Sequence, residues 1–326
     1  MKILVIGGTR FVGRHFVDAA LADGHEITLF NRGQSNADLY PQVENLVGDR
    51  EQDLSALDGK KWDVVVDTCG YVPRIVRMSA EKLANAVDRY LFISTISVYE
   101  AMPQPGMDEE APLQKLEDPT VEEITGETYG GLKVLCEQAV EEVFPGRALQ
   151  VRPGMIVGPH DPTDRYTYWV VRNAQDGEIL VPGRPDRPVQ FIDGRDLGAG
   201  TLKLIVDGAT GYYNATGPEQ PLTWEQWMQS CATAAGTEPN FTYVSDEFLT
   251  EKEINGGDLP FWVPPEYEKI FAVSVQRAVD AGFTYRPAVE TARDTYAWRN
   301  VSSVSELKVG LKPEREAELL AAWHRK

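Results

Sequence analysis

The sequence has few of the residues that build disulfide frameworks or metal sites. Its 326 residues include only 3 cysteines and 4 histidines, and these lie far apart along the chain. An odd number of widely spaced cysteines does not form a disulfide scaffold, and metal sites need their ligands in close groups. We therefore expect neither a disulfide framework nor a metal site built by the protein.

Long apolar runs and clusters of basic residues are also missing. No stretch approaches the roughly 20 apolar residues that span a bilayer. The short run at residues 3–6 leads into two glycines, unlike a signal peptide, so we expect a cytoplasmic protein without a membrane segment. The chain has 32 Lys and Arg against 50 Asp and Glu, a net charge of −18. Because basic side chains supply most of the affinity for nucleic acids, we expect no nucleic-acid partner.

The first half of the chain alternates between short apolar segments and helical patterns. Residues 2–6, 26–30, 62–67 and 90–93 are typical of buried strands. Strands separated by helices favour right-handed crossovers and a parallel sheet, so the pattern predicts an α/β fold. Beyond about residue 158, proline, glycine and aromatic residues become frequent and the alternation is less regular.

A glycine-rich turn joins the first predicted strand to the first predicted helix. Glycines in such a turn let the backbone approach a pyrophosphate, which then lies at the helix N-terminus. The position of this turn, directly after the first strand, indicates a dinucleotide cofactor. The residues of the turn that we expect to line the cofactor are Gly7, Thr9, Arg10, Phe11, Val12 and Gly13.

Basic residues near this turn favour NADP over NAD. Position 10 is Arg where regular glycine spacing would place a glycine, and Asn31-Arg32 follow the second strand. NAD-binding proteins normally carry Asp or Glu there, and such a carboxylate would repel the phosphate of NADP. Guanidinium groups bind phosphates well. We therefore expect NADP, with NAD as the alternative, and we place Asp49 and Arg50 near the adenine.

A tyrosine and a lysine stand four residues apart in a predicted helix that begins near residue 128. Tyr129 and Lys133 would share one face of this helix, where the ammonium lowers the pKa of the phenol. Such a tyrosine exchanges a proton with a carbonyl or alcohol oxygen while a hydride moves. Gly130 and Gly131 weaken the helix and thus indicate a close backbone approach. Thr95 follows a strand, at the edge where parallel sheets bind ligands.

These three sites, in this order, resemble the extended short-chain dehydrogenase/reductase superfamily, which contains NAD-dependent epimerases and dehydratases. The segments 152–159 and 189–197 are similar to later segments of that family. The resemblance implies a Rossmann-type doubly wound parallel sheet with a smaller C-terminal mixed α/β substrate domain. Residues 1–158 with about 188–215 would form the dinucleotide-binding domain, and about 159–187 with 216–326 the substrate-binding domain.

The resemblance also implies roles for single residues. By position, Thr95, Tyr129 and Lys133 match the catalytic residues, and Tyr129 and Lys133 also contact the cofactor. The remaining cofactor-lining positions that it implies are Cys69, Gly70, Pro153 and Met155.

This sequence departs from the family pattern at two positions that concern the substrate. Family members that act on nucleotide sugars often carry Asn where this chain has Met155, and a diphosphate-binding Arg where it has Val189. Arg187 lies two residues before Val189. These departures argue against a nucleotide-diphosphate sugar as the substrate.

The opening motif and residues 29–33 resemble an atypical branch of the family, which includes chloroplast stem-loop RNA-binding proteins and uncharacterised bacterial reductase-like proteins. Our leading hypothesis is an NAD(P)-dependent oxidoreductase or epimerase that acts on a small molecule, with Tyr129 as general acid/base. The alternatives are an RNA-binding or endonuclease-like protein and a catalytically silent cofactor sensor. A homodimer is compatible with the sequence. Candidate substrate-binding residues are Tyr71, Ser97, His160, Tyr166 and Trp169.

Overall fold

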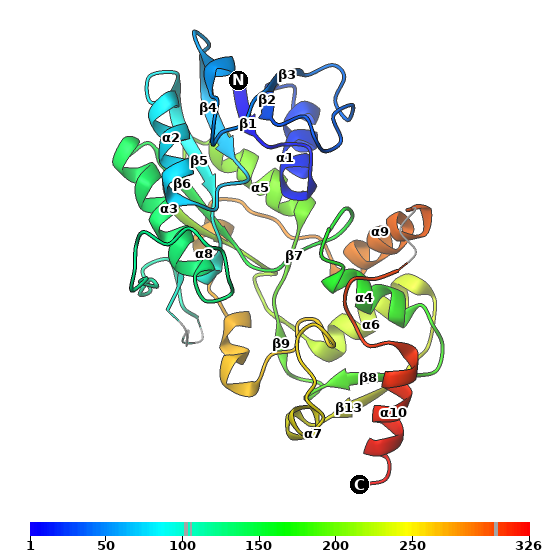
Figure 1. The fold of residues 1–326 in the computed structure, drawn as a ribbon. Coiled ribbons are helices and arrows are strands. Elements are labelled where there is room, and N and C mark those ends of the chain that lie inside the picture. Colours follow the sequence, from blue (N-terminus) through cyan, green and yellow to red (C-terminus); the bar gives the residue numbers. More distant parts are fainter. Residues whose placement is uncertain (101–103, 105, 303–305) are drawn as a thin grey trace.

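A seven-stranded parallel sheet forms the centre of the N-terminal part. The structure is a computed structural model that describes residues 1–100, 104, 106–302 and 306–326. The strand order is β3-β2-β1-β4-β5-β6-β11, and every neighbouring pair is parallel (Figure 1). This arrangement confirms the predicted α/β fold. The bounds are β1 (Lys2–Ile6), β2 (Glu26–Asn31), β3 (Glu44–Val47), β4 (Trp62–Asp67), β5 (Val87–Ile93), β6 (Ala148–Pro153) and β11 (Gly211–Ala215).

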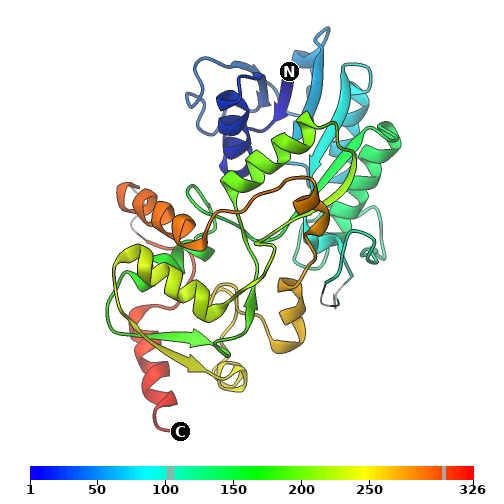
Figure 2. The same ribbon diagram turned by 180° about the vertical axis from the view of Figure 1, so that it is seen from behind.

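Helices cover both faces of this sheet, as Figure 2 shows from behind. Helices α1 (Phe11–Ala22) and α5 (Gly194–Val206) pack on one face, and α2 (Pro73–Leu83) and α3 (Tyr129–Val143) on the other. Side chains of β1 alternate between the two cores, since Val5 packs under α1 and Leu4 packs on the opposite side. Burial on both faces explains why these strands are continuous apolar runs. The strand order reverses between β1 and β4, where doubly wound sheets bind ligands.

A smaller α/β region follows β6 and is built on an aromatic core. It contains three two-stranded pairs, β7 with β10, β8 with β13 and β9 with β12. Its strands are β7 (Ile156–Val157), β8 (Glu178–Pro182), β9 (Pro188–Val189), β10 (Ile192–Asp193), β12 (Leu222–Thr223) and β13 (Asn240–Val244). Its α-helices are α4 (Arg165–Asn173), α6 (Trp224–Ala235), α7 (Asp246–Glu251), α9 (Ala288–Val301) and α10 (Pro313–Trp323). The single-turn and 3₁₀ elements of the chain are η1 (Ser55–Leu57), η2 (Ile96–Val98), η3 (Pro265–Phe271) and α8 (Gln276–Asp280).

The chain returns to the N-terminal sheet after η3. Ala278, in α8, and Phe283 pack into the core that α1 and α5 cover. The side-chain amide of Asn214, in β11, donates to the Ser274 carbonyl oxygen at 3.1 Å. Residues near 274–283 therefore pack against the sheet, although the prediction assigned residues 216–326 to the substrate-binding domain. The predicted division into two domains stays a prediction, and this return is a feature that the sequence did not indicate.

The acidic segment between η2 and α3 is anchored to the sheet. Glu109 is buried, and its carboxylate accepts a hydrogen bond from the Asn214 backbone at 2.7 Å. Arg152 donates to the Glu109 carbonyl oxygen at 3.3 Å, and the Arg277 guanidinium lies 3.6 Å from the Glu109 carboxylate. These contacts hold the segment beside the carboxyl edge of the sheet. Residues 101–103 and 105 lie outside the described residues.

The buried carboxylate of Asp67, at the end of β4, accepts hydrogen bonds from three neighbouring segments. Asp67 is fully buried, and Arg50 donates to both of its oxygens at 2.8 and 2.7 Å. The Tyr90 hydroxyl donates at 2.8 Å, and the Cys69 backbone N–H at 3.2 Å. Burial alone would raise the pKa of Asp67, but the charge and hydrogen bonds of Arg50 hold it below the usual range. Asp67 therefore stays ionised and ties the loops after β3 and β4 to β5.

Replacing Asp67 with Asn tests this constraint. The variant leaves the buried guanidinium of Arg50 without its counter-charge, so the free energy of unfolding should fall by about 3–5 kcal/mol. Urea unfolding at neutral pH measures the loss. Asp88→Asn is the control, because Asp88 is exposed on β5 and should change stability by less than about 0.5 kcal/mol. Equal stability of the two variants would contradict a structural role for the Asp67–Arg50 pair.

Candidate functional site

Two adjoining cavities lie at the carboxyl edge of the sheet. The first, the glycine-loop cavity, has a volume of about 610 Å³ and lies against residues 6–13, 30–35 and 48–51. The second, the Tyr129 cavity, has a volume of about 630 Å³ and lies against Thr95, Tyr129 and Lys133. Phe11, Val12, Thr68 and Tyr71 line both, so the two cavities adjoin each other.

The glycine turn has the geometry that a pyrophosphate needs. A Cβ atom at Gly13 would lie 2.7 Å from the Gly8 backbone nitrogen, so only glycine allows α1 to pack this closely against the turn. The cap residue of α1, Arg10, makes no side-chain cap hydrogen bond, and the first turn of the helix contains no acidic residue. The first N–H groups of α1 are thus left for an anionic ligand. The turn fits a dinucleotide on these grounds.

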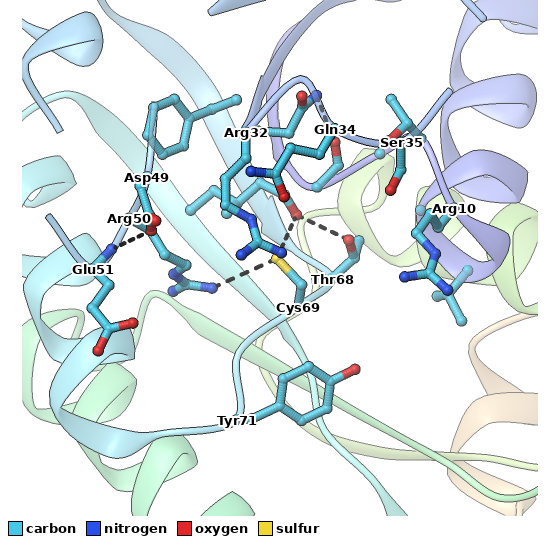
Figure 3. A pocket seen from close by; sticks show the side chains of 18 of the residues that line it. Arg10, Arg32, Gln34, Ser35, Asp49, Arg50, Glu51, Thr68, Cys69 and Tyr71 are labelled. Atoms are coloured by element: carbon cyan, nitrogen blue, oxygen red, sulfur yellow. Dashed lines mark hydrogen bonds between the residues drawn. The ribbon is translucent and has the colours of Figure 1, made fainter. Parts of the chain in front are cut away.

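Arginine side chains enter the glycine-loop cavity from two directions. Figure 3 shows Arg32 pointing inward from the loop after β2, and Arg10 on the side of α1. Within the described ranges, neither guanidinium has a carboxylate at ion-pair distance. Asn31 shapes this loop, because its amide donates to the Gly7 carbonyl oxygen at 3.3 Å and its oxygen accepts from Gly33 N–H at 2.8 Å.

Asp49 and Arg50, which we predicted to lie near the adenine, differ in how far their side chains are available to a cofactor. Asp49 lines the glycine-loop cavity, and its side chain accepts a hydrogen bond from the Glu51 backbone at 3.1 Å (Figure 3). Arg50 also lines this cavity, but its guanidinium is bound to Asp67. A cofactor would therefore meet Arg50 as part of the wall, with its hydrogen-bonding groups already engaged.

The N-terminus of α3 lies against the turn that follows β5. A Cβ atom at Gly130 would come within 2.1 Å of the Ser97 carbonyl oxygen, which confirms the close backbone approach predicted from the two glycines. Thr95 accepts from Ser97 N–H at 3.1 Å and donates to the Ser97 hydroxyl at 3.2 Å. Thr95 and Tyr129 both line the Tyr129 cavity. Gly130 thus lets the helix that carries Tyr129 lie against the turn that carries Thr95.

Lys133 is more deeply buried than its four-residue spacing from Tyr129 suggests. It is 2% exposed and donates to the carbonyl oxygens of Gly70 at 2.7 Å and Ile93 at 2.8 Å. Burial lowers the pKa of Lys133 to about 8. Burial raises the pKa of Tyr129, and Thr95 and the charge of Arg165 oppose this effect. The lowering of the Tyr129 pKa by Lys133 stays a prediction.

Several other predicted residues lie where the sequence placed them. Tyr71 is 46% exposed and lines both cavities, and Ser97 lines the Tyr129 cavity. Cys69 lines the glycine-loop cavity, and Pro153 and Met155 line the Tyr129 cavity.

Three predicted substrate-binding residues lie away from the cavities. Tyr166 and Trp169 are fully buried in the aromatic core, where Tyr166 stacks on Trp227 with ring centroids 5.5 Å apart. The expectation that they contact substrate is corrected, because α4 turns them into the core. His160 packs against Trp298 at 5.3 Å, and burial followed by the charge of Arg14 lowers its pKa to about 4.

Residues that the sequence did not single out complete the Tyr129 cavity. Arg165 lies at the start of α4 and Gln114 in the acidic segment, and both line the cavity. The Gln114 side chain donates to the Ser97 carbonyl oxygen at 3.0 Å. An apolar wall comes from Met107, Tyr267, Ile270, Phe271 and Val273. No local pattern marks these residues, because their positions depend on how the C-terminal region packs on the sheet.

Metal sites and membrane-spanning helices are both absent from the part of the chain that the structure describes. There, no group of three or more His, Cys, Asp or Glu side chains is arranged to hold a metal ion. None of the helices in the same ranges combines the length and apolarity that crossing a bilayer requires.

The doubly wound sheet, with a glycine-rich turn at its switch point, is a Rossmann-type α/β architecture. Residues 3–215 match the profile of the NAD dependent epimerase/dehydratase family. The chain therefore belongs to this family, which confirms the resemblance seen in the sequence motifs.

Individual proteins show how far the similarity extends. The chain is 26% identical over 306 residues to the chloroplast stem-loop binding protein of 41 kDa b from Arabidopsis thaliana, over 85% of this chain and 73% of that protein. A 62-residue stretch is 38% identical to bifunctional pinoresinol-lariciresinol reductase from Forsythia intermedia, over 19% and 20% of the two chains. UDP-glucuronic acid 4-epimerase from Bacillus cereus, solved with NAD, shares the fold, with a TM-score of 0.67 and 16% identity over 92% of this chain and 99% of that one.

The name of the Arabidopsis relative states that it binds a stem-loop. Our expectation of no nucleic-acid partner is therefore untested, and so is the expected cytoplasmic location.

The buried ammonium of Lys133 predicts a pH dependence of stability. Its pKa in the folded protein, about 8, lies below the ordinary lysine value of 10.5, so the unfolded chain binds more protons between these values. Stability should therefore rise with pH from about 8 to about 10 relative to Lys133→Met. Urea unfolding across this range measures the difference. The control Lys61→Met removes an exposed lysine and should give a flat difference. A flat difference for Lys133 as well would contradict a desolvated ammonium.

Proposed function

We propose that this chain is an NADP-dependent oxidoreductase or epimerase that acts at a carbonyl or alcohol carbon of a small molecule. The observation that carries the proposal is that Thr95, Tyr129 and Lys133 line one cavity, which adjoins the glycine-loop cavity. A cofactor cradled by the glycine turn would thus extend toward an acid/base group beside a space for substrate.

Each residue has a distinct task in this proposal. The nicotinamide cofactor, when bound, supplies or accepts the hydride. Tyr129 gives a proton to the substrate oxygen in reduction and takes it back in oxidation, while the Thr95 hydroxyl holds that oxygen. An ammonium has three donors, and the carbonyl oxygens of Gly70 and Ile93 use two of those of Lys133. The third remains for the nicotinamide ribose. Epimerisation would use the same residues for oxidation and then re-reduction.

The state of Arg187 supports a substrate other than a nucleotide-diphosphate sugar. Its side chain is fully buried, donates to Asp246 at 2.8 Å and lies 3.5 Å from Glu268. A guanidinium bound to two carboxylates in this way is not available for a diphosphate. Val189, the position at which family members often carry their arginine, is also fully buried and lines neither cavity.

The cofactor preference can be reversed at Arg32. Arg32→Asp replaces an exposed cation of the glycine-loop cavity with a carboxylate, which repels the 2′-phosphate and accepts from ribose hydroxyls. Since a hydrogen bond to a charged group contributes about 1.5–3 kcal/mol, NADP(H) affinity should fall by roughly tenfold or more while NAD(H) affinity is kept or rises. Calorimetric titration with both cofactors measures this. Arg293→Asp, at an exposed arginine outside both cavities, is the control. A wild-type protein that binds NAD(H) more tightly would refute the assignment of Arg10 and Arg32.

Replacing Tyr129 with Phe tests the acid/base role. The change removes one hydroxyl and keeps the ring, so turnover should fall by about 10²–10⁴-fold while NADP(H) affinity changes little. Thr95→Ala should lower turnover less, because Thr95 orients the oxygen without supplying the proton. Steady-state rates with NADPH and a panel of small aldehydes and ketones, and with NADP⁺ and the matching alcohols, provide the measurement.

Tyr213→Phe is the matched control, since Tyr213 lies on β11 and lines neither cavity. Near-normal turnover by Tyr129→Phe would overturn the proposed mechanism. That result would favour the second candidate, a stem-loop-binding protein, which the similarity to the Arabidopsis relative supports and the net charge of −18 opposes.

A further inference from the structure

The Tyr129 cavity contains an arginine that has no ion-pair partner. Arg165 is half-buried, and it donates to the Thr163 hydroxyl at 3.1 Å through Nε and to the Met155 sulfur at 3.1 Å through Nη1. Over the described ranges, no carboxylate oxygen lies within 4 Å of its guanidinium. Arg165 and Tyr129 line the same cavity.

Arg165 differs in this respect from Arg152 and Arg187, whose side chains are fully buried. Arg152 is paired with Glu137 at 2.7 Å, and Arg187 with Asp246 at 2.8 Å. A cation taken partly out of water without a counter-charge is costly, so such a group normally has a partner. Arg165 also begins α4, where the helix dipole disfavours a positive charge and favours an anion. A negatively charged ligand in the cavity would reduce both the cost of the unpaired charge and its unfavourable interaction with the helix dipole.

The acidic residue Asp161, which also lines this cavity, does not take that place. Asp161 is 2% exposed, and one of its oxygens accepts from Thr163 N–H at 2.8 Å and from the Thr163 hydroxyl at 2.7 Å. Its other oxygen is sealed from solvent and has no partner within the described residues. Burial raises the pKa of Asp161, although the charge of Arg165 opposes this.

The remaining charges of the cavity limit the ligand to one negative charge. Lys133 is engaged by backbone carbonyl oxygens, and Glu100 adds a negative charge at the cavity wall. A single available guanidinium beside carboxylates matches a monoanion such as a carboxylate better than a phosphate dianion. The wall formed by Ile270, Phe271 and Val273 is apolar and suits a hydrocarbon body.

We propose that Arg165 binds a carboxylate of the substrate and so sets the substrate class: a small carboxylic acid with an apolar body and a carbonyl or alcohol carbon near Tyr129. The fork of N–H groups on the guanidinium matches the two oxygens of a carboxylate. This inference rests on the proposed function for its orientation toward Tyr129, whereas carboxylate binding at Arg165 is testable without turnover.

The test compares 3-phenylpropanoate with 3-phenylpropanamide, which has nearly the same shape and no charge. Each is titrated by calorimetry into the full-length protein, with and without NADP⁺. The wild type should bind the carboxylate about tenfold more tightly than the amide. Arg165→Met should abolish this preference and leave amide affinity unchanged, while Arg165→Lys should retain part of it. Arg293→Met, which removes an exposed positive charge outside the cavities, should behave as the wild type.

NADP⁺ affinity, measured on the same variants, distinguishes a substrate-binding role of Arg165 from a cofactor-binding role. The NADP⁺ affinities of all the variants should agree within about twofold. A preference that survives in Arg165→Met would overturn the proposal, as would a wild type that shows no preference for this acid or its homologues one carbon shorter and longer. Loss of NADP⁺ affinity in Arg165→Met would instead make Arg165 a cofactor residue. Failure of the wild type to bind NADP⁺ would overturn the proposed function, and the carboxylate preference of the free protein would still decide the role of Arg165.

Discussion

The candidate site depends on one buried charge, the Asp67 carboxylate at the end of β4. By accepting from Arg50, Tyr90 and the Cys69 backbone, it fixes the loops that leave β3 and β4. The loop after β4 then presents the Gly70 carbonyl oxygen to Lys133. Because Lys133 belongs to α3, the same chain of contacts reaches the helix that begins at Tyr129. A buried carboxylate that lines neither cavity thus holds the acid/base group in register with the glycine turn.

Close packing of backbone on backbone provides the second constraint. Gly13 lets α1 lie against the glycine turn, and Gly130 lets α3 lie against the turn that carries Thr95. Any side chain at these positions would push apart groups that must act together. The stability lost by placing glycine in a helix is of order 1 kcal/mol at each position, which the surrounding packing offsets.

Charge is distributed unevenly between the surface and the cavities. The chain carries a net charge of −18, yet Arg10, Arg32 and Arg165 all line the two cavities and lack ion-pair partners in the described ranges. An acidic surface keeps anions away in general, while isolated arginines in concave, partly desolvated places attract them locally. This distribution is consistent with two successive anionic groups, one on a cofactor and one on a substrate.

The sequence alone determined the features that depend on neighbours along the chain. The apolar runs with intervening helices predicted the parallel sheet, and short spacings identified Gly7 to Gly13 and the pair Tyr129 and Lys133. Tertiary structure decided what depends on distant contacts. Helix α4 turns Tyr166 and Trp169 into the aromatic core and brings Arg165 to the cavity, although all three lie within five residues. The environment of Lys133 was likewise decided by Gly70 and Ile93, which lie 63 and 40 residues away and pair their carbonyl oxygens with its ammonium. Periodicity shows which face of a helix is apolar, but the direction of that face, and the charge state of a buried group, follow from which distant segments pack against it.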